Sequence, residues 1–322
     1  MKSKQFAMPT VDSLALQKYS RSLKLMGNNF TITVVANDEN AAEPLIDAAV
    51  DEIRRIERLL TTFNDESQTN LINANAGIKP VIVDLEVFNL IERSIAISDI
   101  TQGAFDITYG GIDKTLWNFD KSMTTLPSDS DAKKMVHLIN YKNIVLNRES
   151  QSVFLKEKGM RIGFGGIGKG YAAEMAKKIL QKNNVESGII NASGDLTTWG
   201  NQPDGKPWTI GIANPDHPEM AFSYIEISNK AVATSGNYEK YILIGGKKYS
   251  HTIDPKTGLP ISGIKSVTII HDNAEFADAM ATPISVMGIN AGLFLVNQIP
   301  DLYCLIIDDN NTIYTSKNIN LT

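Results

Sequence analysis

The chain has 322 residues, of which 43% are hydrophobic and 21% charged, values typical of an ordinary soluble globular protein with one large domain or two modest ones. The formal net charge of −5 argues against a general nucleic-acid binder, and no apolar stretch reaches the length of a membrane span. A single cysteine excludes a disulfide within the chain, and four scattered histidines make a zinc cluster a poor hypothesis.

The N-terminal part of the chain predicts a lead-in, a strand and a long helix. Residues 1–22 are expected to be poorly ordered, ahead of a single two-lobed domain at residues 23–322. They carry no apolar signal core and no lipobox-like cysteine, so we expect a cytoplasmic protein, or a cell-envelope protein whose export signal is not part of this sequence. Residues 30–35 are rich in β-formers, and residues 41–60 place apolar side chains at helical spacing with most charges on the other face.

A polar, turn-rich segment follows that helix. The ring of Phe63 could be a core plug or an exposed stacking surface, and the plug is the favoured interpretation. Ser67 can cap a short helix. A second amphipathic helix is predicted over residues 85–98, before a Gly-Ala-Phe-Asp motif at 103–106. His137, in a short helix candidate further on, is expected on the surface.

The most informative stretch is glycine-rich and lies at residues 163–170. It follows residues 160–162, a strand-like apolar run, and precedes residues 172–180, a run of good helix formers. This order leaves backbone N–H groups at a helix N-terminus, where the helix dipole favours an anion. Lys169 adds a movable cation suited to phosphate. The spacing matches neither Walker A nor G-x-G-x-x-G, so a tight turn without a ligand is an equal alternative.

Short strands dominate the rest of the chain. They are joined by short turns, which favours antiparallel pairing. They are predicted at residues 143–146, 152–155, 187–191, 208–213, 222–227, 231–234, 241–244 and 265–270, and Cys304 is expected to be buried in a further strand. Because helices and strands interleave irregularly, the predicted fold class is α+β with a mostly antiparallel core.

Two segments near the C-terminus carry candidate chemistry. His251 precedes a predicted turn at residues 255–258, a position suited to acid–base work, although a lone histidine is more often structural. Asp278 and Thr282 are four residues apart in a predicted helix, so they share one face and offer the hard oxygen ligands that suit Mg²⁺. The alternative is a capping Asp and a Thr bonded back to the helix. Pro283 should bend or break this helix and free backbone oxygens near the pair.

Taken in order, these segments resemble the ApbE family, the FAD:protein FMN transferases. The resemblance runs from Met26 to Gly288, and no single piece of it is specific alone. The pieces are Met26-Gly27, Thr62-Phe63 with Ser67 and Asn73, Gly103-Ala104-Phe105-Asp106, the glycine-rich loop with Lys169-Gly170-Tyr171, Ser193-Gly194-Asp195, Thr234-Ser235-Gly236-Asn237-Tyr238, residues 251–258, and Ala277-Asp278-Ala279 with Thr282. Together they are a strong match, and the last two are the most specific.

The resemblance implies an activity that the residues alone would not. Members split FAD, attach FMN through a phosphoester to a Thr or Ser of a partner flavoprotein, and release AMP with the help of Mg²⁺. The implied fold is a tunnelling-fold-like architecture with a smaller lobe and FAD in the cleft between the lobes. Some relatives mainly hydrolyse FAD, so a Mg²⁺-dependent FAD pyrophosphatase is one alternative. A non-catalytic FAD-binding protein is another.

The resemblance also implies roles for individual residues. Asp278 and Thr282 would hold Mg²⁺ together with a backbone carbonyl, that of Gly166. His251 would be the base for the incoming hydroxyl, with Asp254 the less favoured candidate. The substrate FAD would contact Met26, Phe63, Ala104, Phe105, Asp106, Gly163, Lys169, His251 and Ile253.

Three residues depart from the family pattern. Gly163 stands where many relatives have an aspartate that contacts the nucleotide, and Phe63 replaces a common tyrosine. Pro283 follows the metal-site threonine in place of a small helix former. These departures bear on affinity and on the balance between transfer and hydrolysis, because none of them removes a proposed metal ligand.

Overall fold

The computed structural model describes residues 16–112, 123–214, 221–236, 241–317 and 319 of the chain. Within these ranges helices and antiparallel strands alternate irregularly, which confirms the predicted α+β class. The main sheet has the strand order β1-β2-β6-β7-β10-β13-β14-β15, and each neighbouring pair is antiparallel. Its strands are β1 (Gln17–Leu25), β2 (Asn28–Ala36), β6 (Gly188–Ala192), β7 (Asp195–Trp199), β10 (Ala231–Gly236), β13 (Ile264–His271), β14 (Tyr303–Asp308) and β15 (Ile313–Thr315).

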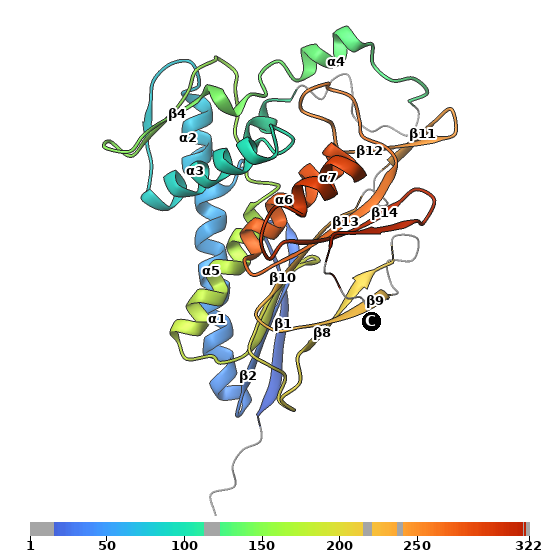
Figure 1. Cartoon of the computed structure of the whole chain (residues 1–322). Coiled ribbons are helices and arrows are strands. Elements are labelled where there is room, and N and C mark those ends of the chain that lie inside the picture. The colour runs from blue at the N-terminus through green and yellow to red at the C-terminus, as the bar shows by residue number, and fades with distance from the viewer. Residues whose placement is uncertain (1–15, 113–122, 215–220, 237–240, 318, 320–322) are drawn as a thin grey trace, which may run out of the picture.

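Helices cover one face of this sheet. α1 (Glu39–Leu60), α5 (Gly168–Lys182) and α6 (Ala274–Met287) lie side by side against it, and α7 (Ile289–Val296) follows α6 (Figure 1). The apolar stripe predicted for α1 is buried, and the large hydrophobic core lies between these helices and the sheet. In the described ranges, no helix combines the length and the apolar character needed to cross a membrane.

The opposite face of the sheet is covered by a hairpin of β8 (Trp208–Ala213) and β9 (Ala221–Ile227). Trp208 and Ile225 of this hairpin pack with Leu196 and Leu305 of the sheet in a second core. A further hairpin, β11 (Tyr241–Ile244) and β12 (Lys247–Ser250), extends to the right in Figure 1. Cys304 is buried in β14, as predicted.

A smaller group of elements lies at one end of the helical layer, at the upper left and top of Figure 1. It contains a three-stranded antiparallel sheet in the order β3-β5-β4. Its elements are α2 (Gln68–Ala74), β3 (Val81–Ile82), α3 (Leu85–Ile100), the 3₁₀ turn η1 (Ile107–Gly111), α4 (Asp129–Met135), the 3₁₀ turn η2 (Tyr141–Asn143), β4 (Ile144–Asn147) and β5 (Ser152–Leu155).

The prediction of a disordered lead-in at residues 1–22 is wrong for residues 17–22. They belong to β1, which pairs with β2 along its full length, whereas residues 1–15 lie outside the described part of the chain. β1 is an edge strand whose outward positions are polar, so it lacks the apolar run that marked β2. Arg21 of β1 forms ion pairs with two acidic residues of α1, which anchors the edge to the helical layer.

Candidate functional site

An asparagine side chain holds the start of the glycine-rich segment. The backbone N–H of Ile162 donates to Asn73 Oδ1 (2.7 Å), and Asn73 Nδ2 donates to the carbonyl of Ile162 (3.0 Å). The buried Asn73 thus takes the place of a neighbouring strand, and the strand predicted at residues 160–162 is absent from this described stretch. The N–H of Gly163 donates to the carbonyl of Ile107 (2.9 Å), which ties the loop to η1.

The first turn of α5 touches α6. The backbone N–H of Gly170 donates to Asp278 Oδ2 at 2.9 Å. A Cβ at Gly170 would lie 2.2 Å from the carbonyl oxygen of Ala274 and 2.7 Å from Asp278 Cβ, so only glycine fits between the helices. The helix N-terminus that was predicted to favour an anion therefore already holds a carboxylate of the protein itself.

Lys169 lies between two carboxylates. Its Nζ is 2.9 Å from Asp195 Oδ2 and 3.6 Å from Asp278 Oδ1. Burial lowers the pKa of Lys169, but the charges of Asp278 and Asp195 more than offset this effect and hold the pKa above its usual value. Burial and then the charge of Asp278 raise the pKa of Asp195 to about 6, against the opposing effect of Lys169. The ammonium is therefore charged and is shared unequally between its two partners.

A tight turn brings Asp195 to this position. Ser193 (φ 57°) and Gly194 (φ 103°) link β6 to β7 in left-handed conformations, and Ala192 pairs with Asp195 across the turn. Asp195 Oδ1 accepts from the N–H of Thr234 in β10 at 3.0 Å, so Oδ2 is left for the ammonium. Sequence reasoning used the Ser-Gly-Asp segment only as a piece of the family pattern and assigned Asp195 no role. An acidic residue directly after a two-residue turn, at the start of a strand, was the available signal.

α6 carries the two candidate metal ligands that the sequence paired. Asp278 is 5% exposed, and Thr282, one turn further along, is half-buried. The helix continues to Met287, so a break at Pro283 is excluded, and a bend there stays a prediction. Proline has no N–H, so the carbonyl of Ala279 still loses its usual helical donor.

The predicted Mg²⁺ ligands are one carboxylate, one hydroxyl and one backbone carbonyl, and the two oxygens of the carboxylate, that of Asp278, have different neighbours. The N–H of Gly170 engages Oδ2 of Asp278, whereas Oδ1 is the oxygen that a cation, the ammonium of Lys169, approaches. Gly166, whose carbonyl is the third predicted ligand, is half-buried in the adjoining loop. The described residues contain no group of three or more His, Cys, Asp or Glu side chains placed to hold a metal ion. One carboxylate, a hydroxyl and a carbonyl leave room for water and phosphate oxygens, which is how Mg²⁺ is commonly bound.

Met26 and Phe105 pack against the glycine-rich loop. Met26 forms the turn between β1 and β2 with φ 50°, and its Cε lies 3.7 Å from the Cβ position of Gly168. Cε2 of Phe105 lies 3.6 Å from the position that a Cβ of Gly166 would take. Ala104, the preceding residue, is buried as well. The fold thus brings three pieces of the family pattern together around one loop.

Phe63 projects into solvent beside the same loop. Its side chain is 99% exposed, so the prediction of a core plug is wrong. Asn70 Nδ2 donates to the carbonyl of Thr62 (3.0 Å), and Ser67 caps α2 as predicted by accepting from Asn70 N–H. Thr62 Cγ2 is 3.9 Å from the Cβ position of Gly163. The backbone of this segment is therefore fixed while the ring stays open to a ligand.

Asp106 is buried, and both of its carboxylate oxygens accept hydrogen bonds from the protein. Oδ1 accepts from the N–H (2.8 Å) and the hydroxyl (2.6 Å) of Thr108, and Oδ2 accepts from the N–H of Tyr141 (2.8 Å). Burial raises the pKa of Asp106, and these hydrogen bonds oppose that effect only in part. Its main contribution is to join η1 to η2, which shapes the cavity beside it.

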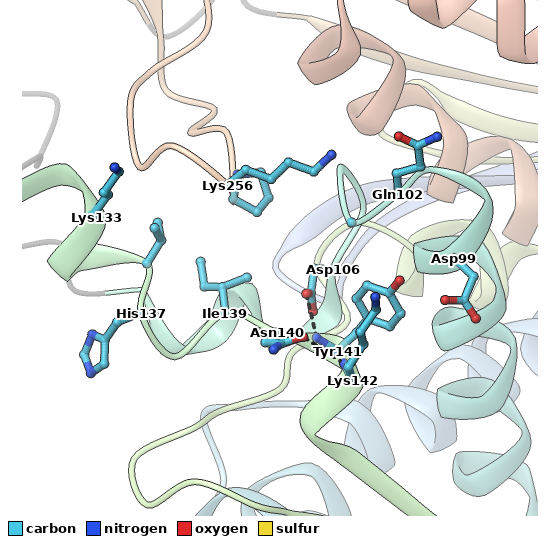
Figure 2. A pocket seen from close by; sticks show the side chains of 13 residues that line it. Asp99, Gln102, Asp106, Lys133, His137, Ile139, Asn140, Tyr141, Lys142 and Lys256 are labelled. Atoms are coloured by element: carbon cyan, nitrogen blue, oxygen red, sulfur yellow. Dashed lines mark hydrogen bonds between the residues drawn. The ribbon is translucent and has the colours of Figure 1, made fainter. Parts of the chain in front are cut away.

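That cavity has a volume of about 790 Å³ and several cationic side chains around it. Figure 2 shows Lys256 on a loop across from Asp106, with Lys133 and the exposed His137 on the far side. The Cβ position of Gly103 is 4.0 Å from Lys256 Cε, so the Gly-Ala-Phe-Asp motif and the 255–258 turn face each other. Its size suits part of a nucleotide, and its lining carries lysines alongside Asp99 and Asp106.

The structure describes the segment that begins at His251 but only part of the segment at residues 234–238. His251 is half-buried directly after β12, and Ile253 is buried with its N–H directed at the hydroxyl of Tyr109 (3.4 Å). Asn237 and Tyr238 lie outside the described residues. The structure therefore places the predicted base next to the cavity-lining turn and leaves its catalytic role as a prediction.

Asp254 shapes the predicted turn. Its Oδ1 accepts from the N–H of Lys256 (2.8 Å), and its carbonyl accepts from the N–H of Gly258 (2.9 Å). Gly258 has φ 73°, and a Cβ there would lie 2.0 Å from the carbonyl oxygen of Ala132, so the turn is packed directly on α4. These contacts explain Asp254 as a turn residue and make it a weaker candidate for a base.

A buried ion pair that sequence reasoning did not single out holds the start of α6. Lys177 Nζ is 3.2 Å from Glu174 Oε1 and 3.3 Å from the hydroxyl of Thr197. Glu174 Oε2 accepts from the N–H of Ala274, the first residue of α6, at 3.2 Å. The pair fixes α6 one turn before Asp278, and from the sequence its residues were described only as part of a run of good helix formers.

Comparisons with known proteins agree on one family. The model of the ApbE family matches residues 26–306. A FAD:protein FMN transferase from Klebsiella pneumoniae (strain 342) is 32% identical over 301 residues, which cover 93% of this chain and 92% of that protein. The crystal structure of the ApbE protein from Thermotoga maritima has a TM-score of 0.83 at 31% identity and covers 94% of this chain and 97% of its own. The apo flavinyl transferase ApbE from Pseudomonas stutzeri has a TM-score of 0.81 at 25% identity, covering 94% and 95%.

Proposed function

The chain belongs to the ApbE family, and from this premise we propose that it is a flavin transferase that attaches the FMN part of FAD to a hydroxyl of a partner protein. The observation that carries the proposal is the cluster of the half-buried Lys169 with the buried Asp195 and Asp278 where α5 meets α6. Attack on a phosphoanhydride needs charge neutralisation and in-line positioning more than covalent chemistry. A fixed cation beside hard oxygen ligands at a helix N-terminus supports both.

In the proposed reaction the hydroxyl oxygen of the acceptor forms a bond to the phosphorus of the FMN half. The bond from that phosphorus to the bridging oxygen breaks, and AMP leaves with this oxygen. The ammonium of Lys169 would bind phosphate oxygens through its positive charge. The N–H of Gly170 is already engaged by Asp278, so the start of α5 contributes by holding this carboxylate in place. The hydroxyl proton passes to a base.

We propose Mg²⁺ as the cofactor, with Asp278, Thr282 and the carbonyl of Gly166 as the residues that would hold it. When bound, the ion neutralises charge on phosphate oxygens. The chain's own contribution is to fix the carboxylate in advance. The N–H of Gly170 engages Asp278 Oδ2, and Glu174 anchors the first turn of α6, so little reorganisation is needed when a ligand arrives.

The flavin end of FAD would lie against Phe63 and Met26. A flavin ring is flat, so the exposed ring of Phe63 suits stacking, and the thioether of Met26 adapts to an aromatic surface. Phe63 lacks the hydroxyl of the tyrosine common in the family, so it offers stacking without a hydrogen bond. The buried Phe105 supports the loop rather than presenting a free face.

His251 is the proposed base for the acceptor hydroxyl. His251→Ala should reduce the rate of FMN transfer by about 10²–10⁴-fold, the usual contribution of general base catalysis, and should weaken FAD binding much less. Single-turnover transfer and an FAD titration monitored by flavin fluorescence measure the two quantities separately. Equal losses in both would show that His251 binds FAD instead of acting as a base.

The alternative with support from the same cluster is an FAD pyrophosphatase, in which water replaces the protein hydroxyl. One experiment separates the two. The protein is incubated with FAD and MgCl₂, with and without a flavoprotein subunit that carries a Thr or Ser flavinylation site, and AMP, FMN and protein-bound flavin are quantified. AMP that depends on the acceptor supports the transferase. AMP and free FMN without the acceptor indicate the pyrophosphatase, and bound FAD without products indicates a binding protein.

A further inference from the structure

We propose that Asp195 is a positioning residue that holds the ammonium of Lys169 away from Asp278 Oδ1 and so keeps this oxygen available to the divalent metal. The inference rests on the proposed function, because it takes Asp278 as a metal ligand. Lys169 Nζ is 2.9 Å from Asp195 but 3.6 Å from Asp278, so the ammonium pairs with the carboxylate that is not assigned to the metal.

Asp195 is held firmly enough to do this. It is 7% exposed, and its two oxygens have separate partners, the N–H of Thr234 for Oδ1 and the ammonium of Lys169 for Oδ2. The preceding turn through Ser193 and Gly194 fixes the backbone at the start of β7. The carboxylate is therefore anchored to the sheet, whereas Asp278 is anchored to α6.

Lysine is the side chain that could interfere with metal binding at this site. Its ammonium sits on a flexible four-carbon stem, so it moves toward the nearest uncompensated carboxylate. If the charge of Asp195 were lost, Asp278 would be the carboxylate within reach, because its Oδ1 already lies 3.6 Å away. An ammonium in contact with Oδ1 would compete with a divalent cation for the same oxygen and would repel it electrostatically.

Asp195→Asn isolates this effect. The amide keeps the shape of the side chain, and its oxygen can still accept from the N–H of Thr234. Its NH₂ group then faces the ammonium of Lys169, and two donors cannot pair. The variant therefore keeps the link to β10 and removes only the attraction that draws Lys169 away from Asp278.

The test titrates MgCl₂ alone into metal-free protein by calorimetry, without FAD. We expect Asp195→Asn to bind Mg²⁺ roughly 10–100-fold more weakly, the usual size of effect when a residue just outside the ligands of a metal site is changed. Lys169→Met should bind Mg²⁺ at least as tightly as the wild type. The double variant Asp195→Asn/Lys169→Met should return to within about threefold of the wild type, because the neutral pair no longer offers a competing cation.

Matched controls separate this role from a general loss of charge or of structure. Asp47→Asn removes a carboxylate from the ion pair with Arg21 on the β1–α1 surface and should leave Mg²⁺ affinity unchanged. Asp278→Asn should abolish binding, and if it does not, the proposed metal site and this inference both fail. Thermal melts of every variant show whether the fold is retained.

Three results would overturn the positioning role while leaving the metal site intact. Unchanged affinity in Asp195→Asn would show that Lys169 does not need this carboxylate. A double variant as weak as Asp195→Asn would show that Asp195 acts directly on the metal and not through Lys169. If Lys169→Met alone bound Mg²⁺ more weakly than the wild type, the ammonium would assist the metal instead of competing with it.

Discussion

Gly170→Ala is predicted to force α5 away from α6 at the point where Asp278 is held. The new methyl would lie 2.2 Å from the carbonyl oxygen of Ala274 and 2.7 Å from Asp278 Cβ, and both atoms belong to the first half of a packed helix. Favourable carbon contacts lie at about 3.5–4.0 Å, so the helices must separate by roughly 1 Å. The hydrogen bond from Gly170 N–H to Asp278 Oδ2 then weakens.

Two effects of Gly170→Ala lower the free energy of unfolding, and one raises it. Overpacking of a core costs about 1–3 kcal/mol, and loss of a hydrogen bond to a charged group costs about 1.5–3 kcal/mol. Alanine recovers about 1 kcal/mol through its better helix propensity. We therefore expect the free energy of unfolding to fall by about 2–4 kcal/mol, since these terms are not fully additive. Mg²⁺ affinity should fall with it.

Urea unfolding followed by circular dichroism measures this change. Gly165→Ala is the matched control, because Gly165 lies in the same loop and a Cβ there would meet nothing within 4 Å. The control should stay within about 1 kcal/mol of the wild type. A Gly170→Ala protein as stable as this control, or more stable, would refute the argument that the close approach of α5 and α6 requires glycine.

Three other predictions follow from burial and exposure. Phe63→Ala should leave the free energy of unfolding within about 0.5 kcal/mol of the wild type, because the ring is 99% exposed, and should weaken FAD binding by about 0.5–1.5 kcal/mol through lost stacking. A fluorescence titration that finds unchanged FAD affinity would remove Phe63 from the flavin site. Glu174→Gln leaves the ammonium of Lys177 buried without its counter-charge, so urea unfolding should show a loss of about 3–5 kcal/mol, and a loss below about 1 kcal/mol would contradict the anchoring role of this pair. Burial raises the pKa of the Cys304 thiol, so the folded protein at about pH 8 should react with a disulfide reagent only after denaturation, and rapid labelling of the native protein would contradict its burial in β14.

Periodicity predicted the elements that bury an apolar face. α1 was recognised because its apolar residues recur at helical spacing, and the strand that became β2 because its β-formers are continuous. β1 was missed because an edge strand with polar outward positions has no such run. The strand at residues 160–162 was predicted from apolar content, but Asn73, almost ninety residues earlier, supplies its hydrogen bonds through a side chain. Local pattern carries no information about such a partner.

In the candidate site, too, local spacing predicted some contacts, and others depend on the tertiary structure. Asp278 and Thr282 could be paired from the sequence because helical spacing alone places them on one face. The partner of Lys169 could not be identified from the sequence, because Asp195 lies on another strand and reaches Lys169 only through the turn before that strand. Phe63 was misplaced because an aromatic residue after a helix is usually buried, and only the tertiary structure shows that nothing covers it.

The ratio of AMP released to flavin bound covalently to an acceptor subunit, measured with FAD and Mg²⁺, tests the proposed transfer reaction. We predict one AMP for each flavin attached, with the flavin on a Thr or Ser hydroxyl, and neither product from Asp278→Asn. AMP released in excess of attached flavin would instead indicate hydrolysis by water. Flavin transfer that persists in Asp278→Asn would contradict the proposal that the start of α5 and the facing side of α6 form the catalytic centre.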